Sequence, residues 1–153
     1  MYSREEVKKL KEEFWTTFGQ YMVGIVSSDM EKINWVNYKT GIKHLYFRMD
    51  ASAKSAIIMI ELAHPDEGIR NLMYAQFQEL RSVFQDILNE DWDWSEEYYD
   101  DFGKKTARIS CSLEKVCVFK KEDWPKLISF LKPRLIALDE FWSTAKYAFD
   151  IFK

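Results

Sequence analysis

The residues on which many catalytic and cofactor-binding motifs depend are scarce in this sequence of 153 residues, which contains two cysteines, two histidines and five glycines. None of the glycines forms a G-x-G-x-x-G or G-x-x-x-x-G-K-[ST] pattern, so the loops that hold nucleotide phosphates on backbone amides are missing. His44 and His64 have no arrangement with a serine or cysteine that marks a catalytic triad. We therefore expect no cofactor and no hydrolase that uses a nucleophile.

Cysteine is too rare for a disulfide framework, because Cys111 and Cys117 are the only two. The sequence predicts strands at residues 106–113 and 116–120, joined by a two-residue turn. Such a turn would place the two thiols on opposite faces of a sheet. We expect both cysteines to be reduced and no disulfide to form.

An excess of charge of one sign is also absent, as are long apolar runs. Lys and Arg number 22 against 25 for Asp and Glu, and a formal net charge of −3 gives no global field that attracts nucleic acid or an anionic membrane. No apolar run approaches the roughly 18 to 20 residues of a transmembrane helix, and the first residues do not resemble a secretory signal. These features predict a cytoplasmic location and no membrane partner, and they disfavour nucleic acid as a partner.

Apolar and aromatic side chains are plentiful by contrast. The composition is 47% hydrophobic, with 6 Trp, 8 Tyr and 11 Phe, and this area must be buried in a core, a groove or a subunit contact. A chain of this length buries about 70% of the surface that its unfolded form exposes. We predict one globular domain spanning residues 1–153.

Hydrophobic periodicity predicts the elements of the first half. Ser3 and Glu6 form a capping box at the start of an amphipathic helix, and Asp66 is placed to cap a second helix. Between them, three runs rich in β-branched and aromatic residues read as an antiparallel meander whose third strand, apolar on both faces, belongs in the middle of a partly covered sheet. The predicted ranges are a helix at 3–21, a loop at 24–32, strands at 33–38, 44–50 and 55–63, and a helix at 67–88.

The second half repeats this order. Trp92 and Trp94 lie in a short predicted strand, which the strands at 106–113 and 116–120 follow. Asp123 caps a last helix of about seven turns, which Pro133 should kink or divide. The predicted fold is α+β with a mainly antiparallel sheet, in the order helix and then twice strand-strand-strand-helix. Only the order of elements suggests a duplication.

Three long strings carry a resemblance to a known family: INWVNYKTGIKHLYFRMD (33–50), IELAHPD (60–66), and EDWP followed by FLKPRLIALDEFWSTAKYAF (130–149). They resemble the bacterial and archaeal family catalogued as domain of unknown function 4268. The resemblance covers almost the whole chain but includes no catalytic signature. In that family the domain occurs alone or after a part that looks like a restriction-type nuclease. The resemblance implies an accessory or interaction module of an intracellular prokaryotic system.

An alternative hypothesis is a degenerate or rearranged metal-dependent nuclease, because helix, three antiparallel strands and helix resembles the core of PD-(D/E)XK enzymes. Asp50 ends one predicted strand and Glu61 lies in the next, where two carboxylates could share Mg²⁺ and activate water. Ala63, however, stands where that motif has a lysine. Glu61, His64 and Asp66 could also form a small metal site, although their spacing is not diagnostic. Carboxylates paired in salt bridges are the plainer interpretation.

The chain also carries acids interleaved with aromatic residues, namely Glu90, Asp91, Asp93, Glu96, Glu97, Asp100 and Asp101 among Trp92, Trp94, Tyr98 and Tyr99. One interpretation is a solvated edge strand whose charges oppose aggregation. The other is a docking surface in which aromatic residues anchor and acids attract a basic partner.

The last predicted helix has an apolar surface wider than one sheet can cover. We predict that Phe141 or Trp142 is buried, and that the remaining strip forms a two-fold contact between copies. The favoured function is a non-enzymatic protein-interaction module. Its predicted surface comprises Trp92, Trp94, Tyr98, Tyr99 and Phe141, and its partner is another protein or a second copy.

Overall fold

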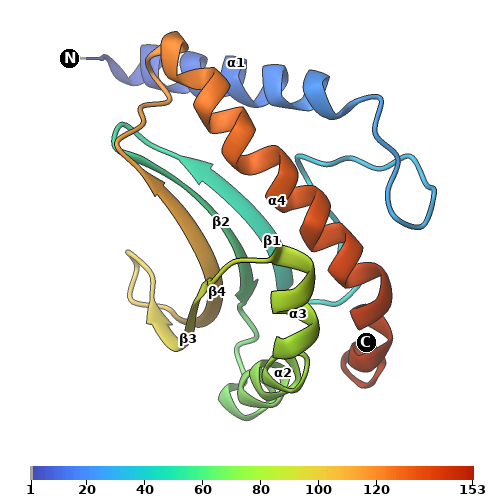
Figure 1. The fold of residues 1–153 in the computed structure, drawn as a ribbon. Helices are drawn as coiled ribbons and strands as arrows, with labels where there is room; N and C mark the ends of the chain where they lie inside the picture. Colours follow the sequence, from blue (N-terminus) through green and yellow to red (C-terminus); the bar gives the residue numbers. More distant parts are fainter. Residues whose placement is uncertain (1) are drawn as a thin grey trace.

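The computed structural model describes residues 2–153, which form helices packed on one antiparallel sheet (Figure 1). The helices are α1 (Arg4–Met22), α2 (Glu67–Glu79), α3 (Arg81–Leu88) and α4 (Trp124–Ala145), with the 3₁₀ segments η1 (Lys121–Asp123) and η2 (Lys146–Phe152). The strands are β1 (Leu45–Ala51), β2 (Ser55–Leu62), β3 (Asp93–Tyr99) and β4 (Lys105–Glu114), in the sheet order β1-β2-β4-β3. The predicted α+β class with an antiparallel sheet is confirmed.

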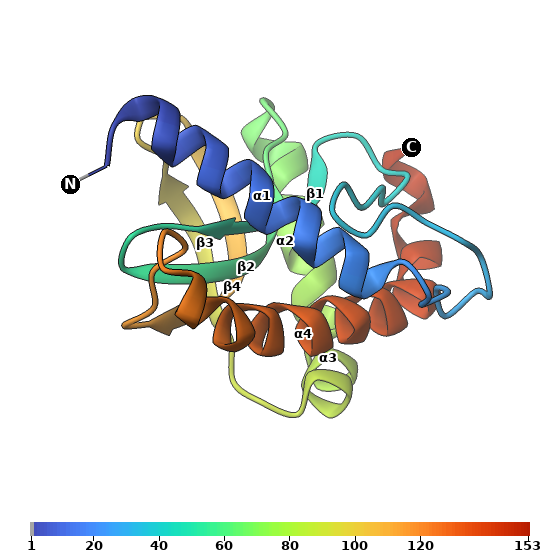
Figure 2. The same ribbon diagram turned by 90° about the horizontal axis from the view of Figure 1, so that it is seen from above.

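The helices cover one face of the sheet. Residues of β1, β2 and β4 that point to that face are largely buried, among them Phe47, Ile60 and Ile109. Helix α4 runs diagonally across it, with α1 crossing near its start and α2 and α3 near its end (Figures 1 and 2). The opposite face carries no helix within residues 2–153.

Strand β2 lies between β1 and β4, as its apolar sequence predicts. On the face without helices, Met59 is nevertheless buried, because it lies directly between Arg48 of β1 and Ser110 of β4. The partial cover expected for this face therefore comes from side chains of the neighbouring strands rather than from another layer.

Local signals for helix ends are confirmed at two places. The Glu6 N–H donates to the Ser3 hydroxyl and the Glu6 carboxylate accepts from the Ser3 N–H, which completes the capping box of α1. Asp66 caps α2 by accepting from the Ile69 N–H at 2.9 Å. The helix predicted at 67–88 is in fact two helices, because the chain leaves the helical conformation at Leu80.

Pro133 does not divide α4, which runs without interruption from Trp124 to Ala145. A proline inside a helix costs about 3 kcal/mol because it removes one hydrogen bond and its ring crowds the preceding turn. Leu131 and Leu135, on either side of Pro133, are both buried. Burial of the apolar stripe on both sides holds the helix together across the proline.

The strand predicted at residues 33–38 does not form. The indole of Trp35 is buried and donates a hydrogen bond to the Ile25 carbonyl at 2.9 Å. The ring of Tyr38 stacks on Phe47 with the two centroids 5.0 Å apart. Residues 33–38 form a loop whose aromatic side chains pack against the core. The stretch therefore has the composition of a strand although its backbone pairs with no other strand.

The strand predicted at residues 116–120 is also wrong. The Val118 N–H donates to the Ser52 carbonyl at 3.0 Å, so this segment lies against the turn between β1 and β2 instead of pairing with β4. The Asp123 carboxylate accepts from the Cys117 N–H at 2.9 Å. Asp123 therefore holds this segment and does not cap α4 as predicted.

The two cysteines are free, as predicted, but they are not separated by the two-residue turn on which that prediction was based. Cys111 lies in β4, whereas Cys117 lies in the irregular segment that follows. The chain leaves β4 at Lys115, whose backbone is left-handed with a φ of 62°. The two-residue hairpin that would have separated the thiols does not exist.

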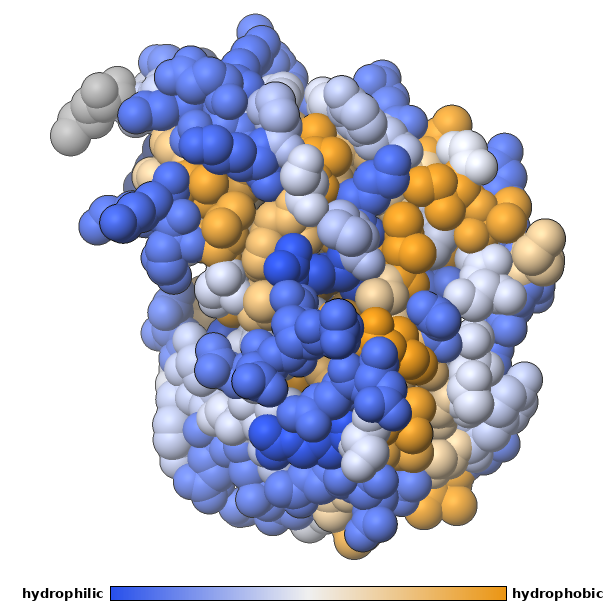
Figure 3. All heavy atoms as spheres, viewed as in Figure 1, coloured by the Kyte–Doolittle hydropathy of each residue, from blue (hydrophilic) through white to orange (hydrophobic). Residues whose placement is uncertain are grey.

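None of the helices in residues 2–153 combines the length and apolar character needed to span a membrane. Figure 3 shows hydrophobic residues gathered at the upper right, over the segment that follows α1. The exposed apolar side chains of that segment, residues 23–44, are Val23, Val26, Met30 and Val36. Since these side chains face outward, the attachment of this segment to α4 depends on other contacts.

Candidate functional site

The two carboxylates that a nuclease-like site would need do not converge. In the sheet register, Glu61 lies opposite Tyr46 and Asp50 lies opposite Ile57. Both side chains are on the same face, but four positions of strand separate them, a distance of about 13 Å at the usual rise per residue. They cannot share one metal ion in this arrangement.

Arginines neutralise the charge of Glu61. Its carboxylate lies 2.7 Å from Arg48 Nε and 3.7 Å from Arg108 Nη2, while the Asp50 carboxylate lies 3.9 Å from Lys11 Nζ. This arrangement matches the plainer interpretation of strand carboxylates held in ion pairs. No cluster of three or more His, Cys, Asp or Glu side chains within residues 2–153 is placed to hold a metal ion.

Two residues of the predicted interaction surface lie in the core. Trp92 is 5% exposed and Phe141 is fully buried, and the ring of Phe84 meets both edge-on, with centroids 5.3 and 5.2 Å apart. Helix α3, which carries Phe84, packs against α4 and closes over these rings. The prediction that they form a docking surface is wrong. The alternation of acids and aromatics around Trp92 does not show which face a helix covers, and Phe141 lies on the side of α4 that faces the core.

The α4 surface expected to join two copies is covered within the chain. Most of its apolar residues from Leu127 to Ala145 are buried, Ile136 and Ala137 only partly, and both Phe141 and Trp142 are buried as predicted. The strongly exposed apolar side chains near this end, Tyr147 and Ile151, belong to η2. Little of the stripe is left exposed, and the two-fold contact between copies stays a prediction.

Among the remaining predicted residues, Trp94 is half-buried against Tyr74 and Phe84, whereas Tyr98 and Tyr99 lie at the hairpin between β3 and β4, on the β3 edge of the sheet. Tyr98 and Tyr99 are exposed there, and Phe102 at the tip is 95% exposed. The Asp100 carboxylate accepts from the backbone N–H groups of Phe102 and Lys104 at 2.9 and 2.8 Å. We call Tyr98, Tyr99 and Phe102, with the acids Glu96, Glu97, Asp100 and Asp101, the hairpin surface.

The turn that carries Phe102 has a defined conformation, so the exposure of this ring is a fixed feature of the loop. Gly103 adopts a left-handed backbone with a φ of 78°, which glycine tolerates, and its N–H donates to the Asp100 carbonyl at 2.9 Å. The loop is therefore a defined turn that holds a large ring in solvent. Sequence reasoning missed Phe102, although a phenylalanine inside a D-D-F-G turn was a usable signal.

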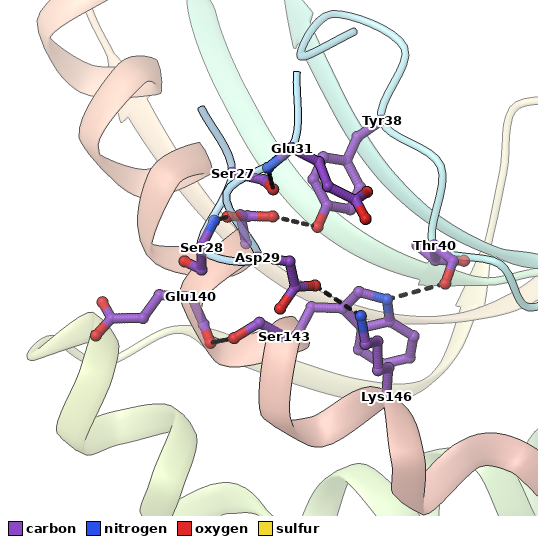
Figure 4. Close-up of polar contacts among 11 residues, drawn as sticks. Ser27, Ser28, Asp29, Glu31, Tyr38, Thr40, Glu140, Ser143 and Lys146 are labelled. Atoms are coloured by element: carbon purple, nitrogen blue, oxygen red, sulfur yellow. Dashed lines mark hydrogen bonds and ion pairs between the residues drawn. The ribbon is translucent and has the colours of Figure 1, made fainter. Parts of the chain in front are cut away.

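A second feature is a cavity of about 330 Å³ between the segment of residues 23–44 and the C-terminal half of α4. We call it the α4 cavity. Asp29, Glu31 and Tyr38 from the segment and Lys146 at the end of the helix line this cavity, and Figure 4 shows Lys146 reaching Asp29. The cavity thus lies where charged and aromatic groups converge.

Asp139 of α4 is the centre of this arrangement and is only 4% exposed. Its carboxylate accepts from the Tyr38 hydroxyl at 2.6 Å and from the Ser28 N–H at 2.7 Å. Two further contacts join the segment to the helix, an ion pair between Lys146 and Asp29 at 2.7 Å and a hydrogen bond from the Trp142 indole to the Thr40 carbonyl at 2.9 Å. These contacts hold a long irregular segment in one position.

The surroundings shift two ionisation equilibria at the cavity. Burial raises the pKa of Tyr38 well above its usual value, and the hydrogen bond and negative charge of Asp139 raise it further. The hydrogen bond to Asp29 raises the pKa of Lys146. Both side chains therefore keep their protons across the physiological range.

The raised pKa of Tyr38 predicts a loss of stability in alkali. Below pH 10 the phenol is protonated in both states, but above it the unfolded chain loses this proton while the folded chain keeps it. The stabilising contribution of Tyr38, about 2 kcal/mol for a hydrogen bond to a charged group, therefore decreases as the pH rises above 10. Urea unfolding from pH 8 to 11 measures the free energy of unfolding of the wild type and of Tyr38→Phe. The difference between the two should be constant up to about pH 10 and should then shrink. A constant difference up to pH 11 would contradict the raised pKa.

Sequence reasoning also missed the α4 cavity. Asp139 lies among Leu135, Leu138 and Trp142, on the side of the helix that is buried. A single acid within an apolar helical stripe is rarely buried unless it has hydrogen-bond partners. That position was a usable signal, but the partners come from a segment about 100 residues away.

The comparison with protein families gives one finding. The family model described as a domain of unknown function, DUF4268, matches residues 10–146. The chain belongs to this family. The matched range of the DUF4268 domain includes both the hairpin surface and the α4 cavity. No curated protein and no solved structure matches the chain.

Proposed function

We propose that this DUF4268 chain is a non-enzymatic interaction module that docks on another protein through the hairpin surface. The observation that carries the proposal is Phe102, 95% exposed at the tip of an ordered turn. Burying such a ring in a partner's pocket contributes about 2 kcal/mol or more. Because the turn is already ordered, little conformational freedom is lost on binding.

The charges around Phe102 favour a basic partner. Lys105 is already engaged, since its ammonium lies 2.7 Å from Glu67 and 3.0 Å from Glu97, and these hydrogen bonds raise its pKa to about 12. Glu96 and Asp101 have no ion-pair partner among the described residues, and neither has Lys104, so two free carboxylates face one free ammonium group at the hairpin. Free carboxylates around exposed aromatic rings steer and orient a surface that carries Lys or Arg.

The edge of β3 itself is a poor site for adding a strand from a partner. The register of β3 with β4 shifts between Ser95 and Tyr98, and such an irregularity interrupts the regular edge. The acids on this strand further oppose pairing with another edge. Docking through side chains at the hairpin tip therefore fits the geometry better than strand addition.

The test compares three forms of the purified chain: the wild type, Phe102→Ala and Ile151→Ala. Ile151 is the matched control because it is also apolar and 83% exposed but lies in η2, outside the hairpin surface. Each form is immobilised and used to capture proteins from an extract of the native host, and captured proteins are identified by mass spectrometry. The affinity of each form for the recombinant partner is then measured.

We expect a partner that the wild type and Ile151→Ala bind equally and that Phe102→Ala binds about 10- to 100-fold more weakly, the usual range for an anchoring residue. Raising the salt concentration should weaken binding, because the steering charges are exposed. A partner that binds all three forms equally, or binding that salt strengthens, would contradict docking through the hairpin surface.

A further inference from the structure

We propose that the α4 cavity is a binding site for a small ligand that carries a protonated amine, with Asp139 as its countercharge. The cavity volume of about 330 Å³ is at the lower end of the range of roughly 300–1,000 Å³ for small-molecule sites. This proposal does not depend on the hairpin surface. The hairpin includes β3, one edge strand of the sheet, whereas the segment that lines the cavity leads into β1, the other edge strand.

The first argument is the charge of Asp139. The side chain is 4% exposed, yet no Lys, Arg or His in residues 2–153 forms an ion pair with it. Its two hydrogen bonds come from neutral donors, the Tyr38 hydroxyl and the Ser28 N–H. Buried charges in proteins are normally paired, because an isolated charge loses the stabilisation that water provides. A cationic ligand would supply the missing charge.

The second argument is spare hydrogen-bonding capacity. Each oxygen of the Asp139 carboxylate receives one hydrogen bond, whereas a carboxylate has about four acceptor positions. An ammonium group has three donors. Glu31, which also lines the cavity, supplies a second carboxylate. Of the two lysines that line the cavity, Lys146 is paired with Asp29 and Lys39 forms no ion pair within residues 2–153, so the three lining carboxylates still outnumber the lysines. An amine inserted between Asp139 and Glu31 would use acceptors that remain free.

The third argument concerns the walls. Tyr38 and Trp142 both line the cavity, and aromatic rings attract organic cations through the negative face of the ring. Aromatic walls combined with carboxylates suit an ammonium group on a short carbon chain. The amine could belong to a free metabolite or to the lysine side chain of a peptide, and the test separates these two sources.

The experiment is an NMR titration of the ¹⁵N-labelled chain with n-butylamine and putrescine, with 1-butanol as the neutral match for butylamine. Blocked lysine, Nα-acetyl-lysine methylamide, represents the peptide source. The reporters are the Trp142 indole N–H at the cavity and the Ser28 amide, which donates to Asp139. The Trp124 indole, which donates to Val118 away from the cavity, is the internal control.

We expect saturable shifts of both reporters with amines and none with 1-butanol. Tighter binding of the simple amines than of blocked lysine identifies a free metabolite, and the reverse order identifies a peptide side chain. Asp139→Asn keeps the shape and should weaken binding at least 10-fold. Glu140→Gln is the matched control, because the neighbouring Glu140 side chain points away from the cavity in Figure 4.

Ser143→Leu provides a second variant in case Asp139→Asn does not fold. Ser143 lines the cavity from α4, so a larger side chain would fill the space without changing Asp139, and binding should be lost. The proposal is overturned if no amine moves the Trp142 indole at concentrations up to tens of millimolar. It is also overturned if 1-butanol binds as well as butylamine, or if folded Asp139→Asn binds as tightly as the wild type.

Discussion

Replacing Asp139 with alanine is expected to lower the free energy of unfolding by about 3 kcal/mol, because two donors lose their acceptor at once. The Tyr38 hydroxyl and the Ser28 N–H both donate to this buried carboxylate. A buried donor without an acceptor costs about 1–3 kcal/mol. The segment of residues 23–44 should open more often as a result, since Asp139 is one of its buried contacts with α4.

The measurement combines urea unfolding with amide hydrogen exchange. The Ser28 amide should exchange faster in Asp139→Ala at low urea, whereas the Ile58 amide in the middle of β2 should change only as global stability changes. Glu140→Ala is the matched control, because Glu140 is exposed and should leave stability within about 0.5 kcal/mol. If the two alanine variants are equally stable, Asp139 does not hold the segment.

Replacing Phe141 with alanine is expected to cost about 3–5 kcal/mol of stability, the usual loss for a fully buried phenylalanine. The ring is 0% exposed and contacts Phe77 and Phe84, which brings together α2, α3 and α4. A cavity of this size at the junction of three helices cannot close without moving their backbones. This variant should therefore be the least stable of those described here.

Phe102→Ala is the matched control for Phe141→Ala, because it removes the same atoms from a ring that is 95% exposed. Its stability should stay within about 0.5 kcal/mol of the wild type. Urea unfolding monitored by tryptophan fluorescence measures both. A large loss in Phe102→Ala would mean that the ring is buried in solution, and the hairpin surface would then lack its anchor.

Signals that depend on a few neighbouring residues were the reliable ones. The capping box at Ser3 and the cap at Asp66 each require contacts only three residues apart, so the sequence shows both partners together. The strands β1, β2 and β4 also follow from alternation along a short run. The central place of β2 follows because it is apolar on both faces.

Signals that depend on distant partners failed. Residues 33–38 have the composition of a strand, but that composition suits any segment whose side chains are buried, whether by pairing or by packing. The same limit applies to Trp92, which alternation placed on a surface and which α3 covers. Periodicity shows that one face is apolar but does not show what lies against it.

The sequence by itself determined the α+β class, the main helices, the strands β1, β2 and β4 and the family. Local propensity and periodicity suffice for these, because each depends on residues within one or two turns or along one strand. Tertiary structure alone decided which aromatic residues are exposed and which acids are isolated. Phe102 is free because the hairpin tip extends beyond the helices, and Asp139 lacks a countercharge because Arg134 and Lys146, the basic residues on either side of it along the chain, are paired with Glu90 and Asp29. Both facts depend on packing between segments far apart in the chain.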